Sequence, residues 1–97
     1  DLAALVYDLT ESFPQEEKFG LAFQMRKAAV SAPSNISEGT TVVQVLQYKH
    51  FLEIAIGSLN ELSTQLEIAF RVGFLSEKGY FTAQSLIDEC IATKKKG

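Results

Sequence analysis

The chain has 97 residues, of which 46% are hydrophobic and 22% charged, and its formal net charge is −3. This length provides one small hydrophobic core, and the balanced composition excludes disordered and low-complexity chains. No apolar run approaches the roughly 18 residues that a membrane span requires, and a single cysteine and a single histidine exclude an internal disulfide and a His-rich metal site.

The charge is unevenly distributed along the chain. Three of the nine basic residues, Lys94, Lys95 and Lys96, stand together near the C-terminus, whereas all twelve acidic residues precede them. Nucleic-acid-binding domains usually have a dominant basic surface, and residues 1–93 show the opposite balance. We interpret the lysine cluster first as a solvated chain end.

The chain starts without Met, directly in an amphipathic pattern, and shows no signal-peptide pattern. We therefore expect a cytoplasmic protein whose first residues are missing from this sequence. The free thiol of Cys90 fits a reducing compartment.

The first predicted helix covers about residues 1–11, where apolar residues form one stripe about 100° wide. They are Leu2, Leu5, Val6 and Leu9. Pro14 ends this helix and favours the start of a second one, which we predict over residues 15–38. Pro33 lies inside it, and the residues alone leave two alternatives: a stop near Ala32 or a kink at Pro33.

The third helix, predicted over residues 42–72, has the strongest pattern, because apolar residues recur at alternating steps of three and four. These are Val45, Tyr48, Leu52, Ala55, Leu59, Leu62, Leu66 and Ala69. Gly73 and Phe74 predict its end, and Ser76 predicts the start of a fourth helix over residues 77–93. Short breaks between long helices predict an all-α, up-down-up-down antiparallel four-helix bundle forming one domain, residues 1–97.

The second and third helices are more apolar than one bundle requires. Their apolar arcs are about 200° wide, whereas a helix covered on one side needs only about 100°. We therefore expect a homo-oligomer; a groove for another molecule and a monomer with scattered exposed apolar residues are the alternatives. The interface candidates are Phe19, Phe23, Val30, Ile54, Ile56, Ile68 and Phe70.

Arg26 lies within the apolar arc of the second helix, where an unpaired charge would be costly. We expect a salt bridge to Glu38 or Glu61, with an anion-binding role and a side chain that reaches solvent as the alternatives. No catalytic or metal-binding constellation is found, and no cofactor is predicted. His50 and Glu53 could share a metal, but their order is the reverse of the helical di-iron motif, so a solvated pair is preferred.

Two stretches of the chain carry a family resemblance. Residues 9–39 contain SFP and the run RKAAVSAPSNISEG, and residues 51–75 contain GSLNELSTQLEIA. They resemble the four-helix-bundle proteins encoded within intervening sequences of bacterial 23S rRNA genes. The resemblance implies a ring-like homopentamer without an established role. A related bundle, the accessory variability determinant of diversity-generating retroelements, is also pentameric and binds nucleic acid through a basic surface.

The resemblance also implies that the second helix is kinked at Pro33 and continues to about Glu38, and that the first helix begins earlier than this sequence does. The polar residues that match the family are interpreted as an internal network holding the second helix against the third. They are Arg26, Ser34, Asn35, Glu38, Ser58, Glu61 and Gln65. The chain departs from the family at residues 40–46, which lack its Gly/Ser-rich basic stretch, and in its acidic charge.

Our leading hypothesis is a non-enzymatic, self-associating scaffold without a membrane or small-molecule partner. The second hypothesis is an RNA- or ribonucleoprotein-binding accessory protein, which the acidic charge disfavours. Its candidate contacts are Lys18, Lys27, Lys49, Arg71, Lys94, Lys95 and Lys96.

Overall fold

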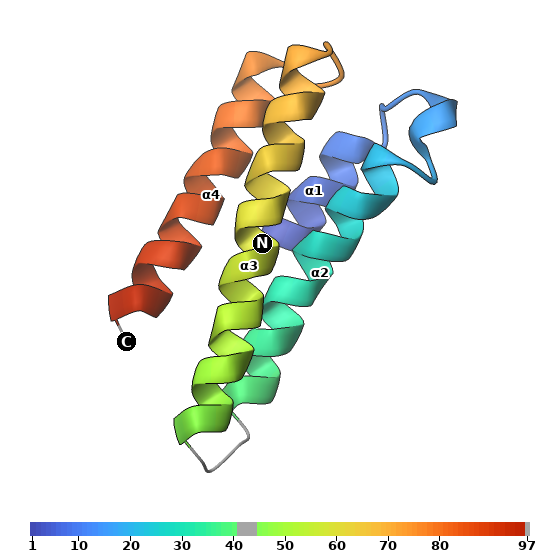
Figure 1. Ribbon diagram of the computed structural model, residues 1–97. Coiled ribbons are helices and arrows are strands. Elements are labelled where there is room, and N and C mark those ends of the chain that lie inside the picture. The colour runs from blue at the N-terminus through green and yellow to red at the C-terminus, as the bar shows by residue number, and fades with distance from the viewer. Residues whose placement is uncertain (41–44, 97) are drawn as a thin grey trace.

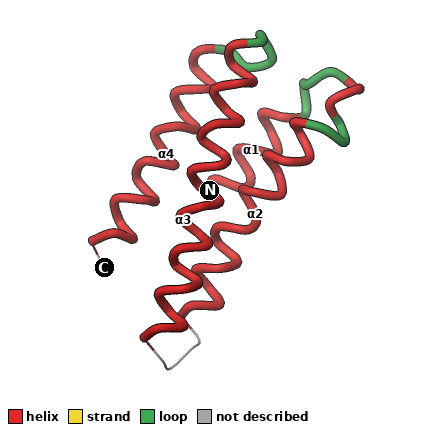
Figure 2. Tube along the Cα trace, in the orientation of Figure 1, coloured by secondary structure: helices red, strands yellow, loops and turns green. Residues whose placement is uncertain are grey.

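The computed structural model describes residues 1–40 and 45–96, and for Thr40 and residues 93–96 it describes the backbone alone. These residues form α1 (Leu2–Thr10), the 3-10 turn η1 (Gln15–Glu17), α2 (Leu21–Thr40), α3 (Val45–Arg71) and α4 (Glu77–Lys96). The described residues contain four α-helices and no strand (Figures 1 and 2). The predicted all-α, four-helix fold class is therefore confirmed.

The second helix begins six residues later than predicted. Pro14 precedes η1 with an extended backbone (ψ 147°) instead of opening a long helix. The turn closes through bonds from Glu17 N to the Pro14 carbonyl and from Lys18 N to the Gln15 carbonyl, and Gly20 N then bonds to the Glu17 carbonyl. Gly20 then separates the turn from α2, because glycine is a poor residue for continuing a helix. The predicted helical residues 42–44 lie outside the described part of the chain.

Helix α2 continues through Pro33 instead of stopping at Ala32. Proline has no N–H to donate to the carbonyl four residues before it, and its ring crowds that turn. Two side chains donate hydrogen bonds to carbonyls in the same turn: Ser34 Oγ lies 2.8 Å from the Val30 oxygen, and Asn35 Nδ2 lies 2.8 Å from the Ser31 oxygen. These bonds supplement the backbone ladder where proline weakens it.

The turn between α3 and α4 follows the pattern expected from its sequence. Gly73 adopts φ +86°, a left-handed conformation that side-chain-bearing residues rarely tolerate. The Phe74 N–H bonds to the Ala69 carbonyl at 2.8 Å, which satisfies the end of α3. Ser76 Oγ accepts from the Gly79 N–H at 3.0 Å and caps α4.

The core lies where the four helices meet. Five residues of the predicted α3 stripe are buried, namely Ala55, Leu59, Leu62, Leu66 and Ala69, together with Met25, Val6 and Ile87 from the other helices. Helix α2 contributes small residues, Ala22, Ala28, Ala29 and Ala32, and this lets it pack closely along α3. Val45, at the start of the same stripe, is 76% exposed, so the buried seam begins further along α3.

Helix α1 is short and packs against α2 and α4. It has nine residues, whereas α3 has 27, and Figure 1 shows it covering only part of the length of α2. At the end of the molecule where α1 finishes, Phe13 packs against Phe74 with ring centroids 5.4 Å apart. This contact joins the segment before η1 to the turn between α3 and α4.

Candidate functional site

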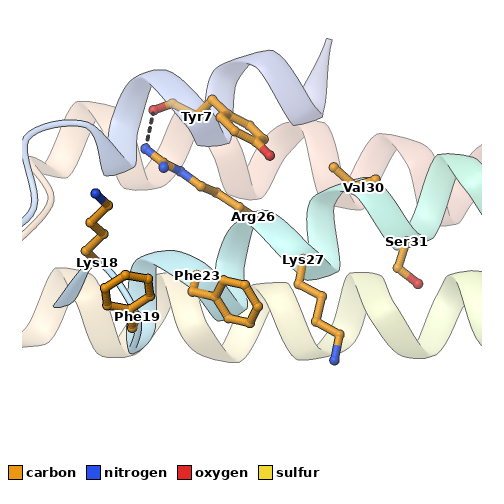
Figure 3. A pocket seen from close by; sticks show the side chains of 8 residues that line it. All are labelled: Tyr7, Lys18, Phe19, Phe23, Arg26, Lys27, Val30 and Ser31. Carbon is orange, nitrogen blue, oxygen red and sulfur yellow. Dashed lines mark hydrogen bonds between the residues drawn. The ribbon is translucent and has the colours of Figure 1, made fainter.

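A pocket of about 600 Å³ lies beside α1, η1 and α2 (Figure 3). We name it the α1–α2 pocket. Its lining residues are Tyr7, Lys18, Phe19, Phe23, Arg26, Lys27, Val30 and Ser31. They are mostly aromatic or basic, and none of them is acidic.

The aromatic side chains of the pocket are unusually exposed. Phe19 is 83% exposed and Phe23 is 49% exposed, and the two rings lie next to each other in Figure 3. Val30, two turns beyond Phe23, continues the same face of α2. This face points away from the buried alanines and Met25, so the protomer leaves it uncovered.

Arg26 is anchored to α1 behind these rings. Its Nε donates to Thr10 Oγ1 at 2.7 Å, its Nη2 lies 3.5 Å from the Tyr7 carbonyl oxygen, and its guanidinium sits 4.8 Å from the Tyr7 ring centroid. The expected salt bridge to Glu38 or Glu61 is wrong. Helix α1 packs against this side of α2 and supplies hydroxyl and carbonyl oxygens instead of a carboxylate.

Two lysines accompany Arg26 in the pocket. The Nζ atom of Lys18 lies 5.7 Å from the Phe19 ring centroid, within the range of a cation–π interaction. Lys27 also lines the pocket and is exposed. Three cations therefore stand beside three aromatic rings, although the chain as a whole is acidic.

A second uncovered surface runs along α3. Ile54, Ile68 and Val72 are 38%, 46% and 56% exposed, and at about 100° per residue they share one helix face with Glu61. We name these four residues the α3 ridge. Ser58, which lies beside this face, contacts Ser31 of α2 with 3.0 Å between hydroxyl oxygens, so the ridge lies on the α2 side of α3.

The other two interface candidates, Phe70 and Ile56, are less exposed and so less available for contact with a second copy. Phe70 stacks on Tyr80 of α4 with centroids 4.8 Å apart and rings nearly parallel, and Ile56 is half-buried. Five exposed apolar residues were not among the predicted interface candidates: Leu46 at 80%, Val45 at 76%, Val72 at 56%, Phe81 at 55% and Tyr7 at 46%. The sequence does not indicate that these side chains are exposed. Phe81 and Tyr7, for example, stand close in the sequence to core residues of amphipathic helices.

The predicted polar network is only partly assembled. Ser58 donates to Ser31, and Asn35 Nδ2 lies 2.8 Å from the Ser31 carbonyl and 3.1 Å from its hydroxyl. Ser31, which sequence reasoning did not select, therefore links Asn35 of α2 to Ser58 of α3. Ser34 bonds within α2, Arg26 bonds to α1, and Glu38 and Glu61 are exposed. Gln65 Oε1 is buried without a hydrogen-bond partner among the described residues.

The basic residues considered for nucleic acid, where their side chains are described, do not all line one pocket. Lys18 and Lys27 share the α1–α2 pocket, whereas Arg71 pairs with Glu67 at 3.1 Å on α3. Lys49 is exposed near the start of α3. The side chains of Lys94, Lys95 and Lys96 lie outside the described residues.

Within residues 1–40 and 45–96, no group of three or more His, Cys, Asp and Glu side chains could hold a metal ion. No helix in this part of the chain is both long and apolar enough to cross a membrane. Cys90 is half-buried and packs against the core cluster.

Comparison with known proteins places the chain in a family. No curated protein matches it significantly. The family model described as "23S rRNA-intervening sequence protein" matches residues 1–95, which is nearly the whole chain and includes α1, the α1–α2 pocket and the α3 ridge. The chain belongs to the 23S rRNA-intervening sequence protein family.

Proposed function

We propose that the protein is a non-enzymatic scaffold that self-associates, with an up-down-up-down bundle as its protomer. The homopentamer is the assembly that the family resemblance favours. We place this scaffold in the cytoplasm, in keeping with the free thiol of Cys90.

The observation that carries the proposal is the exposure of Phe19 beside an anchored arginine. Phe19 is 83% exposed in the protomer, next to Phe23 and Arg26. Aromatic residues and arginine are the residues most enriched in the energetically dominant parts of protein interfaces. Burying a phenylalanine side chain contributes about 1.5–3 kcal/mol. A second protein surface placed over this pocket would recover that energy.

Light scattering of two serine variants tests the proposal. Phe19→Ser removes the exposed ring from the pocket, and Phe81→Ser removes a 55% exposed ring from α4, which contributes no residue to the pocket or the ridge. We expect the first variant to lose mass relative to the wild type and the second to keep it. Equal masses for the wild type and Phe19→Ser would refute a role for this surface in association.

A second candidate function is contact with RNA through the same pocket. The observation that favours it is the group of Lys18, Arg26 and Lys27 beside exposed aromatic rings, with no acidic lining residue. Single-stranded nucleic acid binds where cations meet phosphates and aromatic rings accept bases. The acidic balance of the chain weighs against it.

Fluorescence anisotropy with a labelled single-stranded RNA tests this candidate. RNA binding through the pocket must weaken as salt rises, because counterions are released from the phosphates. It must also weaken in Lys27→Glu. An unchanged anisotropy at about 50 mM salt, where such contacts are strongest, refutes the RNA function.

A further inference from the structure

We propose that copies of this chain associate head to tail, with the α3 ridge of one copy seated in the α1–α2 pocket of the next. The inference rests on the proposed self-association and deepens it, because it names the two surfaces that meet. It commits to a second copy of the chain as the occupant of the pocket.

The charge of the pocket argues against pairing with an identical pocket. A two-fold symmetric contact places the same patch on both sides of the interface. The Lys18, Arg26 and Lys27 side chains of one copy would then face the same basic patch of the other copy, with no acidic lining residue between them. Like charges brought together across an interface cost several kcal/mol. The pocket therefore requires a different surface as its partner.

The α3 ridge has the complementary character. Its three apolar members are β-branched side chains, which suit contact with the exposed Phe19 and Phe23 rings. Its charged member is Glu61, which is exposed and acidic. A ridge seated in the pocket brings this carboxylate toward the lysines and buries the aliphatic side chains against the rings.

The sizes of the two surfaces also agree. Along α3, at 1.5 Å per residue, Ile54 and Val72 lie roughly 27 Å apart. The pocket extends from Phe19 past Phe23 to Val30 (Figure 3). The lining residues within α2, from Phe23 to Ser31, span roughly 12 Å by the same measure, so the ridge is longer than the helical part of the pocket.

The two surfaces share no residue. Arg26, which faces α1 through Thr10, and Ser31, which faces α3 through Ser58, both line the pocket. The pocket therefore spans the face of α2 between α1 and α3, and none of the ridge residues of α3 lines it. Each copy can fill a neighbour's pocket while its own pocket is filled by another copy. Contacts of this kind close into a ring when the rotation between neighbours allows it.

Mixing two variants tests head-to-tail pairing directly. Phe19→Asp disables the pocket and Ile68→Lys disables the ridge, and both positions are exposed enough for the protomer to keep its fold. Each variant alone is expected to be monomeric, because one of its two surfaces is lost. A mixture of the two is expected to form a one-to-one heterodimer of about twice the 10.7 kDa chain mass by native mass spectrometry.

The outcomes of the mixing experiment separately test head-to-tail pairing, the role of each surface and self-association itself. A wild type that assembles while the mixture stays monomeric overturns head-to-tail pairing and leaves self-association standing. A variant that still assembles alone overturns the role of its surface. A monomeric wild type refutes the proposed function itself, and the inference with it. Circular dichroism and thermal melting of each variant establish that the fold is kept.

A charge exchange gives a second test that does not depend on the apolar variants. Lys27→Glu and Glu61→Lys should each weaken association about tenfold by placing like charges together. The double variant restores opposite charges and should recover association to near the wild-type level. No recovery in the double variant overturns the pairing of Glu61 with the pocket.

Discussion

The Nε atom of Arg26 lies 2.7 Å from Oγ1 of Thr10, and this contact fastens α2 to α1 behind the α1–α2 pocket. Thr10 is 3% exposed, and its hydroxyl also donates to the Val6 carbonyl at 2.8 Å. One buried hydroxyl therefore connects the backbone of α1 to the guanidinium of α2. The position of the pocket depends on this connection.

Thr10→Val should destabilise the protomer by about 1–3 kcal/mol, because the substitution keeps the shape but removes the acceptor of a charged donor. The control is Thr82→Val on α4, where the side chain is exposed and the expected change is within about 0.5 kcal/mol. Urea unfolding of both variants measures the difference. Equal unfolding free energies for the two variants contradict an anchoring role for Thr10.

The hydroxyl contact between Ser31 and Ser58 should appear as a coupling energy. Their oxygens lie 3.0 Å apart and join α2 to α3. A double-mutant cycle to alanine is expected to give about 0.5–1.5 kcal/mol, the usual net value of a neutral hydrogen bond. The matched cycle pairs Ser34, which bonds within its own helix, with Ser58 and should give a coupling near zero. Similar couplings in both cycles would show that the Ser31–Ser58 contact contributes nothing specific.

Two glycines should respond to alanine in opposite directions. Gly73 has φ +86°, so Gly73→Ala should cost about 1–2 kcal/mol. Gly57 lies exposed inside α3, where an added methyl group would meet no neighbouring atom within 4 Å. Gly57→Ala should therefore stabilise the helix by up to about 1 kcal/mol. Thermal melts measure whether each substitution raises or lowers the melting temperature. A lower melting temperature for Gly57→Ala means that another molecule, such as a second copy of the chain, covers this open position.

The buried amide of Gln65 should be replaceable. Its Oε1 atom is buried without a partner among the described residues, so the wild-type side chain already carries a desolvation cost. Gln65→Met should change the unfolding free energy by less than about 1 kcal/mol or increase it. Leu66→Ala, at the next residue, removes a fully buried side chain and should cost about 2–5 kcal/mol. A loss of unfolding free energy in Gln65→Met as large as that in Leu66→Ala would show that the Gln65 amide has a hydrogen-bond partner.

The fold was predictable from the sequence because its helices have strong periodic patterns. The buried residues of α3, from Ala55 to Ala69, lie on the predicted stripe, and Gly73 ends the helix as its residue type requires. The start of α2 was not predictable in the same way. Pro14 fits the first position of a helix as well as the position before a short 3-10 turn, and its residue type does not distinguish the two.

The site was less predictable, because its details depend on how the helices pack. The sequence indicated that Phe19, Phe23 and Val30 lie on a surplus apolar face, and these side chains are exposed. It did not indicate that the neighbouring helix α1 contacts Arg26, so the expected carboxylate partner was wrong. Helical phasing places a residue on a side of its own helix but does not say which neighbour covers that side.

Sedimentation equilibrium of the wild-type chain over a concentration series tests the central claim most directly. Self-association predicts a mass several times that of the 10.7 kDa chain, decreasing on dilution toward the monomer. A single species of 10.7 kDa at every concentration would contradict the claim, and the exposed Phe19 and Phe23 would then require a different partner.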